Sequence, residues 1–167
     1  DPLLIDTNRV TLPKLLKSVG YQTAIIGKWH LGFGAPGTDG WDDIKGPDYN
    51  KELKPGPLEV GFDYYFGVPH VGQSPHIFIE NHRVVNLDPN DPIHIELDDR
   101  WKKSKVSYLE RLGVPDHRFK GGEKARYEHE DLAITLTQKA VQRIEAQQQK
   151  DEPFFLYLPW SVPHTPL

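Results

Sequence analysis

The sequence contains neither cysteine nor methionine. Without cysteine the segment can form no disulfide, no thiolate metal site and no cysteine nucleophile, and cysteine usage gives no information about the compartment. Because an initiator methionine is also absent and the chain opens at Asp1-Pro2, we expect these 167 residues to be a fragment of a longer protein.

The sequence also lacks a large net charge and long hydrophobic runs. The net charge is −4, and the basic residues are scattered without forming a stripe, which argues against nucleic acid as a primary partner. No apolar run approaches the roughly 20 residues of a membrane-spanning helix, and no charged-then-apolar signal segment opens the chain. We therefore expect no membrane span.

Proline, by contrast, is abundant. It accounts for 15 of the 167 residues, about 9%, where roughly 5% is ordinary. Aromatic residues are also plentiful, at 11%. This combination indicates long, stiff, ordered loops more than disorder, and loops are where binding sites tend to lie.

Two helix-to-strand units frame the chain. The first helix is predicted from Thr11 to Val19, with Pro13 in the first turn and Gly20 just past the end, and a buried strand follows over 21–26. The apolar spacing that predicts this amphipathic helix is formed by Leu12, Leu15, Leu16 and Val19.

The second unit has the same order. An apolar stripe predicts a helix over about 129–149, a strand candidate follows over 153–159, and a histidine-bearing loop comes next. Two such units indicate an α/β protein, in which ligands collect beyond the carboxyl ends of parallel strands. Lys28, His30 and His164 would then share one edge of the sheet.

The stretch between the two units has weak periodicity. Residues 33–60 are rich in glycine and proline, and an aromatic cluster follows over 61–67. The apolar segments 76–80 and 83–85 flank Asn81-His82 and predict a hairpin. Residues 86–128 are polar and punctuated by turn residues, so we expect a surface insertion there.

One run of thirteen residues, GYQTAIIGKWHLG from Gly20 to Gly32, closely resembles the second signature of the sulfatases, the formylglycine-dependent sulfuric ester hydrolases. Similarity continues in the segments 61–67, 80–84, 153–157 and 163–167. The resemblance as a whole spans most of the chain except about 86–128. The resemblance implies an α/β fold of the alkaline-phosphatase-like kind, a mixed or parallel sheet flanked by helices. Residues 1–167 would be a central part of a single catalytic domain.

The signature suits a sulfate ester, because the sulfuryl oxygens need a fixed positive charge and lysine is a compact point charge on a long stem. By resemblance, Lys28 bridges the sulfate and the hydrated aldehyde nucleophile. His30 contacts the nucleophile and helps to release sulfate as a general base. His164 binds the sulfate and protonates the leaving oxygen, a task that suits imidazole near neutral pH.

His70 and Gln73 occupy positions where relatives often carry polar residues that face the substrate, although the local pattern differs from that of the arylsulfatases. The alternatives remain open at this point: Lys28 as a solvated strand-end residue, and His164 as a loop residue that caps a backbone group. For the whole protein, a phosphate or phosphonate ester hydrolase and a non-catalytic anion-binding relic also remain.

The family's nucleophile precursor and calcium ligands are not found in this sequence. Formylglycine is made from Cys or Ser in a Cys/Ser-x-Pro/Ala-x-Arg context, which is missing here. The acidic pairs Asp42-Asp43 and Asp98-Asp99 follow no hydrophobic strand, and we interpret them as solvated loop charges. We therefore expect the Ca²⁺ ligands and the formylglycine outside this segment, and the segment alone to be inactive.

The resemblance also implies partners and a location for the parent protein. Its substrate would be a sulfated small molecule or carbohydrate, and a formylglycine-generating enzyme would modify it. The location would be periplasmic, secreted or lysosomal. Within the chain, we expect substrate specificity to come from the aromatic cluster and from 86–128, because variable loops on a fixed scaffold usually carry it.

Overall fold

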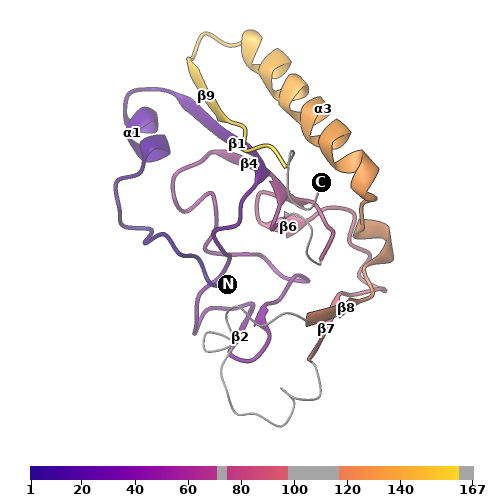
Figure 1. Cartoon of the computed structure of the whole chain (residues 1–167). Coiled ribbons are helices and arrows are strands. Elements are labelled where there is room, and N and C mark those ends of the chain that lie inside the picture. Colours follow the sequence, from indigo (N-terminus) through magenta and orange to yellow (C-terminus); the bar gives the residue numbers. More distant parts are fainter. Residues whose placement is uncertain (71–74, 98–116, 162–167) are drawn as a thin grey trace.

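A computed structural model describes residues 1–70, 75–97 and 117–161 (Figure 1). In chain order the elements are α1 (Leu12–Ser18), β1 (Gln22–Lys28), β2 (Trp41–Asp42), β3 (Gly46–Pro47), β4 (Tyr64–Val68), β5 (Ile79–Glu80), β6 (Arg83–Val84), β7 (His94–Leu97), β8 (His117–Lys120), the 3₁₀ helix η2 (Glu123–Ala125), α3 (His129–Gln148) and β9 (Phe154–Tyr157).

The centre of the molecule is a mixed five-stranded sheet with the order β6-β5-β4-β1-β9. Strands β4 and β9 pair with β1 in parallel, whereas β5 and β6 are antiparallel to their neighbours. Two antiparallel pairs, β2-β3 and β7-β8, lie outside this sheet. The predicted α/β class, the strand after α1, the hairpin and the strand after α3 are all confirmed.

Strand β1 is central because its sequence suits burial on both faces. Its five inner residues are all buried, as the continuous apolar runs of parallel strands require. Successive side chains point to opposite faces, so Ile25 and Tyr65 of β4 join one apolar cluster, whereas Ile26 and Phe66 join the other. The sequence distinguishes 61–67 only as an aromatic cluster, whereas in the structure its second half belongs to the strand β4.

Helix α3 covers one face of the sheet, beside β1 and β4 (Figure 1). The residues that the apolar stripe predicted, Leu132, Leu136 and Ala140, are buried there. Its bounds agree with the predicted helix to within one residue, because a 20-residue segment with this periodicity has one stable way to hide its apolar side.

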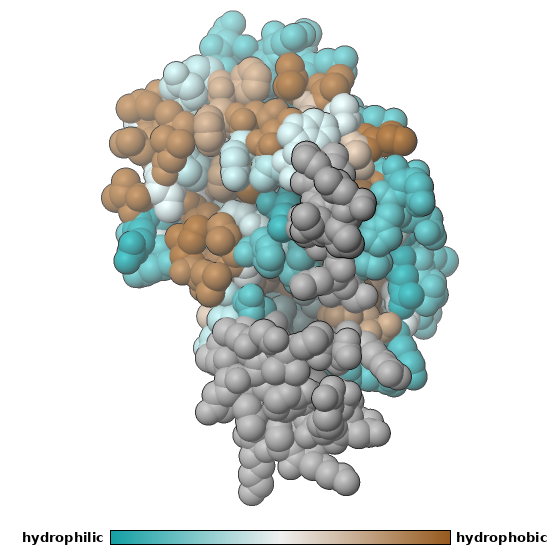
Figure 2. Space-filling view, viewed as in Figure 1, coloured by the Kyte–Doolittle hydropathy of each residue, from teal (hydrophilic) through white to brown (hydrophobic). Residues whose placement is uncertain are grey.

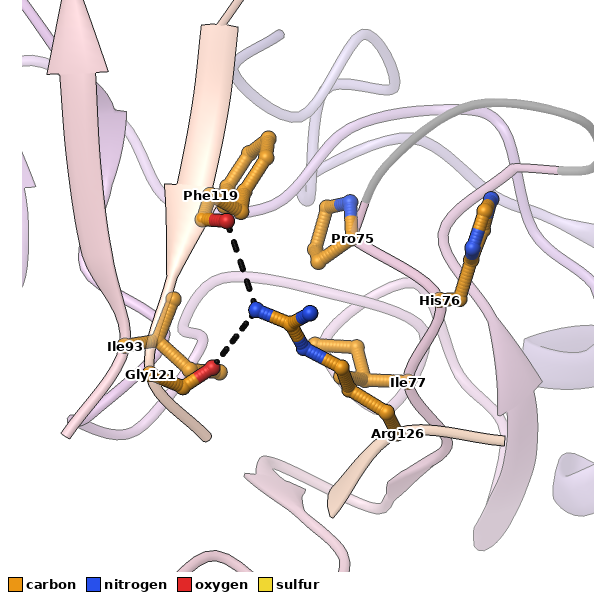
Figure 3. Close-up of a pocket in the computed structure, with 7 residues that line it drawn as sticks. All are labelled: Pro75, His76, Ile77, Ile93, Phe119, Gly121 and Arg126. Carbon is orange, nitrogen blue, oxygen red and sulfur yellow. Dashed lines mark hydrogen bonds between the residues drawn. The ribbon is translucent and has the colours of Figure 1, made fainter. Parts of the chain in front are cut away.

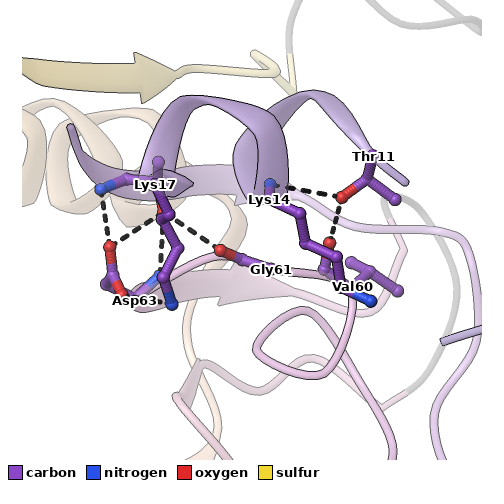
Figure 4. A network of polar contacts seen from close by, with 7 residues as sticks. Thr11, Lys14, Lys17, Val60, Gly61 and Asp63 are labelled. Atoms are coloured by element: carbon purple, nitrogen blue, oxygen red, sulfur yellow. Dashed lines mark hydrogen bonds and ion pairs between the residues drawn. The ribbon is translucent and has the colours of Figure 1, made fainter. Parts of the chain in front are cut away.

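Helix α1 also forms where it was expected, but its apolar side faces outward. Leu12, Leu15 and Val19 are 54 to 64% exposed, and Figure 2 shows hydrophobic side chains gathered on the side of the molecule where α1 lies. The helix is attached by its polar side instead. Thr11 donates to the carbonyl of Val60 and accepts from the backbone of Lys14 at 3.4 Å (Figure 4).

The described ends of 86–128 contribute to the main core. Ile93, beside β7, and Ala125, in η2, are buried in the same apolar cluster as Ile25. An isolated bridge between Ile77 and Arg126 ties the end of this segment to the chain that leads into β5. The predicted insertion therefore has anchored ends, and residues 98–116 between them lie outside the described residues.

In the part of the chain that the structure describes, no helix is both long and apolar enough to cross a membrane.

Candidate functional site

Three parallel strands bring their carboxyl ends to one edge of the sheet. The register pairs Lys28, the last residue of β1, with Val68, the last residue of β4. Strand β9 ends at Tyr157, opposite Ile25, and the chain continues beside β1. This is the edge at which parallel sheets bind ligands, and it is the arrangement predicted for Lys28 and His30.

The backbone of the signature is held from both sides at this edge. The amide of Lys28 donates at 3.0 Å to the carbonyl of Pro159, a residue that follows β9. The next two amides bond to the end of β4 and the residue after it: Trp29 donates to the carbonyl of Val68 at 3.0 Å and His30 to that of Pro69 at 2.9 Å. Lys28 therefore lies where the segments that follow β4 and β9 both bond to the end of β1.

Trp29 anchors the turn that follows Lys28. Its side chain is 6% exposed, its indole Nε1 donates to the carbonyl of Gly32 at 2.7 Å, and its ring lies 6.4 Å from that of Tyr65. Burial of so large a ring fixes the direction of the residues on either side. Trp29 is thus a core residue within the signature, and it orients the polar residues beside it.

His30 has an exposed side chain and a φ of +52°. Positive φ is uncommon for residues other than glycine and costs free energy, and residues held this way cluster at functional sites. The imidazole lies edge-on to that of His70, with ring centroids 5.7 Å apart. The structure therefore brings together two of the residues that the sequence proposed from different strands.

A small hollow lies beside these two histidines. Its lining includes Phe33 and Tyr49 in addition to His30, Pro69 and His70. Sequence reasoning does not find Phe33 or Tyr49, because both come from the loop-rich stretch 33–60, where no periodicity or spacing distinguishes one aromatic residue from another. Two further predicted residues, Gln73 and His164, lie outside the described residues.

The acidic pair Asp42-Asp43 forms hydrogen bonds within its own loop. Asp42 accepts hydrogen bonds from the amides of Ile44 at 2.8 Å and Lys45 at 2.7 Å, and Asp43 accepts one from the indole of Trp41 at 3.1 Å. Asp98-Asp99 lies outside the described residues. Among the described residues, no three His, Asp or Glu side chains come together as metal ligands, so these residues do not fit a calcium ion.

A lysine and two histidines at the carboxyl edge of parallel strands are residue types that suit a small anionic group. Comparisons with known proteins identify the family. The sulfatase family model matches residues 4–167. The chain therefore belongs to the sulfatase family, as the signature predicted.

Curated relatives include sulfatases of bacteria and mammals. An N-acetylgalactosamine-6-O-sulfatase of Bacteroides thetaiotaomicron is 37% identical over 182 aligned positions, which cover 98% of this chain and 34% of the relative. The N-acetylgalactosamine-6-sulfatase of Mus musculus is 31% identical over 93% of this chain and 22% of its own length. The chain thus spans about a third or less of these relatives.

Solved structures share the fold. One from work on the metabolism of multiple glycosaminoglycans by Bacteroides thetaiotaomicron superposes with a TM-score of 0.78 at 35% identity, over 99% of this chain and 36% of the other. A structure of Ps i-CgsB with k-i-k-neocarrahexaose has a TM-score of 0.51 at 23% identity, over 99% of this chain and 29% of the other, and shows the fold alone. The predicted alkaline-phosphatase-like fold is confirmed.

Proposed function

We propose that the protein to which this chain belongs hydrolyses a sulfate monoester of a carbohydrate, and that Lys28, His30 and His70 contact the sulfated group. The observation that supports the proposal is that Lys28 ends β1 opposite the last residue of β4, at the edge where the rings of His30 and His70 lie edge-on to each other. The names of the relatives, which include N-acetylgalactosamine-6-sulfatases, support a sulfated glycosaminoglycan sugar as the substrate class.

Each side chain has a task that its chemistry suits. The Lys28 ammonium neutralises charge on the sulfate oxygens, where a fixed cation is most effective as charge redistributes in the transition state. His30 moves a proton at the nucleophile as sulfate is released. His70, whose ring lies edge-on to that of His30, contacts the sulfated substrate. We further propose that Gln73 binds the substrate, and that His164 binds the sulfate and protonates the leaving alcohol oxygen.

We place the remaining groups in parts of the protein beyond these residues. The nucleophile would be the hydrated aldehyde of a formylglycine, installed by a formylglycine-generating enzyme. Calcium ligands would come from the same outlying sequence, because the described residues do not fit the ion. Residues 1–167 alone would then fold part of the sheet and show no turnover.

Replacement of Lys28 by alanine in the full-length protein tests the assignment. We expect kcat/KM for p-nitrocatechol sulfate and for N-acetylgalactosamine 6-sulfate to fall roughly 100- to 1,000-fold, the loss typical of a missing transition-state contact. The matched control is Lys54→Ala, which removes a lysine whose partner is the exposed Glu52 at 2.8 Å. The control should retain activity, and circular dichroism should show both variants folded.

The same assay distinguishes a sulfatase from the two alternatives, a phosphate ester hydrolase and a non-catalytic anion-binding module. Phosphate is also a tetrahedral anion and needs a similar clamp, so equal turnover of a phosphate diester would refute the preference for sulfate. Binding of the sulfated sugar without turnover, in protein that carries formylglycine and calcium, would leave a non-catalytic anion-binding module. Unchanged activity in Lys28→Ala would remove the proposed role of the lysine.

A further inference from the structure

Two histidines from distant parts of the chain meet where helix α3 begins. His129 is the first residue of α3, and His76 lies on the chain that leads into β5. Their rings are edge-on, with centroids 4.5 Å apart and planes at 66°. Neither histidine has a task in the proposed reaction. Because imidazole gains a proton near neutral pH, the interaction between two rings this close depends on pH.

The ring contact belongs to a short junction, formed by residues 76–77 and 126–129. The amide of Tyr127 donates to the carbonyl of His76 at 3.0 Å, and an isolated antiparallel bridge joins Ile77 to Arg126. The ring of Tyr127 is buried and lies 5.8 Å from that of His76 and 6.2 Å from that of His129. The junction therefore fastens the start of α3 to the chain before β5.

The surroundings of His76 disfavour a positive charge. Burial lowers its pKa most, the neighbouring His129 lowers it further, and Arg126 does the same. Glu128 acts in the opposite direction, with the smallest effect of the four. The neutral imidazole is therefore the form of His76 that the closed junction prefers.

The positive charge of Arg126 is fixed beside the junction. Its Nη2 atom donates to the carbonyls of Phe119 at 3.3 Å and Gly121 at 3.0 Å, so the guanidinium points toward these two residues (Figure 3). Its ion pair with Glu123, at 3.3 Å, involves a side chain that is 69% exposed. Water screens such a pair, so Arg126 still opposes a proton on His76.

The first turn of α3 brings charge of both signs to His129. The backbone amides at a helix N-terminus carry partial positive charge, which disfavours an imidazolium there. Glu130 and Asp131 in the same turn, with Glu128 just before it, act against this. With these effects opposed, the repulsion between two protonated rings is the main change that acid brings to the contact.

The sign of the pH effect follows from the lowered pKa of His76. As pH falls, the open junction, whose imidazole has an ordinary pKa of about 6.5, takes up a proton before the closed junction does. The closed junction is thus most stable above about pH 6.5 and loses stability as pH falls from there toward the lower folded value.

We propose that the contact between His76 and His129 is an acid-sensitive link, which holds the start of α3 against the chain before β5 at neutral pH and releases it in mild acid. His70, the proposed substrate residue, precedes His76 by a short stretch of chain. Release would therefore loosen the connection between the catalytic edge and β5. The proposal does not rest on the proposed function.

Hydrogen exchange in the full-length protein tests the release directly. On acidification from about pH 7.5 to about pH 5, we expect the protection of the Tyr127 amide to fall roughly 5-fold or more after correction for the intrinsic rate. This amide reports on the junction because its acceptor is the carbonyl of His76. Amides around Leu136, which is buried in the middle of α3, should keep their protection.

Two variants separate protonation from packing. His76→Phe keeps a ring that cannot be protonated, so the protection of Tyr127 should no longer depend on pH, whatever its absolute value. His129→Gln removes the neighbouring ring at an exposed position, so the fall in protection should shrink but persist, because burial also disfavours the charged form of His76. The control is His94→Gln, which removes an exposed histidine of β7 and should leave the fall unchanged.

The outcomes are distinct. Equal protection of Tyr127 at both pH values in the wild-type protein would overturn the proposal, and so would an undiminished fall in His76→Phe. An equal fall at Leu136 would indicate unfolding of the whole helix and would also overturn it. These measurements involve no substrate, so their result stands even if the protein proves not to hydrolyse sulfate esters.

Discussion

Three consecutive residues at the end of β1 have three different environments. Lys28 is half-buried at the strand end, Trp29 is buried among aromatic rings, and His30 is exposed with positive φ. The buried ring supplies the free energy that holds its neighbours, and apolar burial of a side chain of this size is worth several kcal/mol. The positive φ of His30 can therefore be maintained, and this backbone conformation places its imidazole beside His70.

Asp63 shows how one carboxylate joins two elements. It accepts hydrogen bonds from the amide of Thr23 at 2.9 Å and from its hydroxyl at 3.0 Å, and Lys17 of α1 lies 2.6 Å from its other oxygen (Figure 4). Burial raises the pKa of Asp63, but the contacts with Lys17 and Thr23 outweigh burial, and the net pKa lies below the usual value.

Replacement of Asp63 by asparagine should therefore lower stability in a pH-dependent way. Because the folded pKa is depressed, the stabilisation is present above the unfolded pKa of about 3.9 and is lost as pH falls through the folded value. Near neutral pH we expect a loss of about 1 to 2 kcal/mol, measured by thermal or denaturant unfolding of the full-length protein. The difference from wild type should shrink below about pH 4.

Asp39→Asn is the control, since Asp39 forms an exposed ion pair with Lys51 at 2.7 Å and should not affect the melting temperature near neutral pH. A difference between Asp63→Asn and wild type that stayed constant down to pH 3 would contradict the assigned ion pair.

At the scale of elements, two glycines allow the central strands to come together. A Cβ atom on Gly67 of β4 would lie 1.8 Å from the carbonyl oxygen of Gly27 in β1, and one on Gly27 would lie 2.1 Å from the carbonyl oxygen of Pro159. All these atoms belong to backbone, which cannot move aside as a side chain can. The glycine of the Gly-Lys-Trp-His-Leu-Gly element thus lets the segment after β9 pass directly beside β1.

Gly67→Ala should accordingly push β1 and β4 apart. We expect a loss of about 3 kcal/mol or more in the free energy of unfolding, at the upper end of overpacking effects, together with reduced activity because Lys28 is displaced. The control is Gly37→Ala, at φ +79° with nothing within 4 Å of the added Cβ, which should cost only about 1 to 2 kcal/mol of backbone strain. Equal melting temperatures for the two variants would refute the close approach.

At the scale of the whole molecule, this chain is about a third as long as the bacterial relative. It holds one side of the proposed site, namely the lysine and the histidines. Divalent cations need several oxygen ligands brought together, and the described residues do not provide such a group. We therefore expect the ligands of the proposed calcium ion to lie outside the described residues.

If the proposed calcium ion is required, chelation should abolish activity of the full-length protein and added Ca²⁺ should restore it, independently of Asp42 and Asp43. We expect the double variant Asp42→Asn, Asp43→Asn to show the same Ca²⁺ concentration for half-maximal activity as wild type, because these carboxylates bind loop amides and an indole. A requirement for roughly 10-fold more Ca²⁺ would place the pair in the metal site instead.

Local patterns predicted much of this architecture. The amphipathic spacing of α3, the apolar run of β1 and the Asn81-His82 turn each specify an element through forces that act over a few residues. The signature predicted Lys28 and His30 because the chemistry and its strand-end context lie within thirteen adjacent residues. Strand β4 was missed because its aromatic residues pack equally well in a strand or in a loop cluster.

The sequence by itself thus determined the family, the strand that carries the signature and the helix α3, since each depends on neighbouring residues. Tertiary structure alone decided that α1 attaches by its polar side, that His70 meets His30, and that the rings of Tyr49 and Phe119 meet edge-on. These contacts join residues far apart in the chain, and their free energy comes from burial that exists only after the strands have paired.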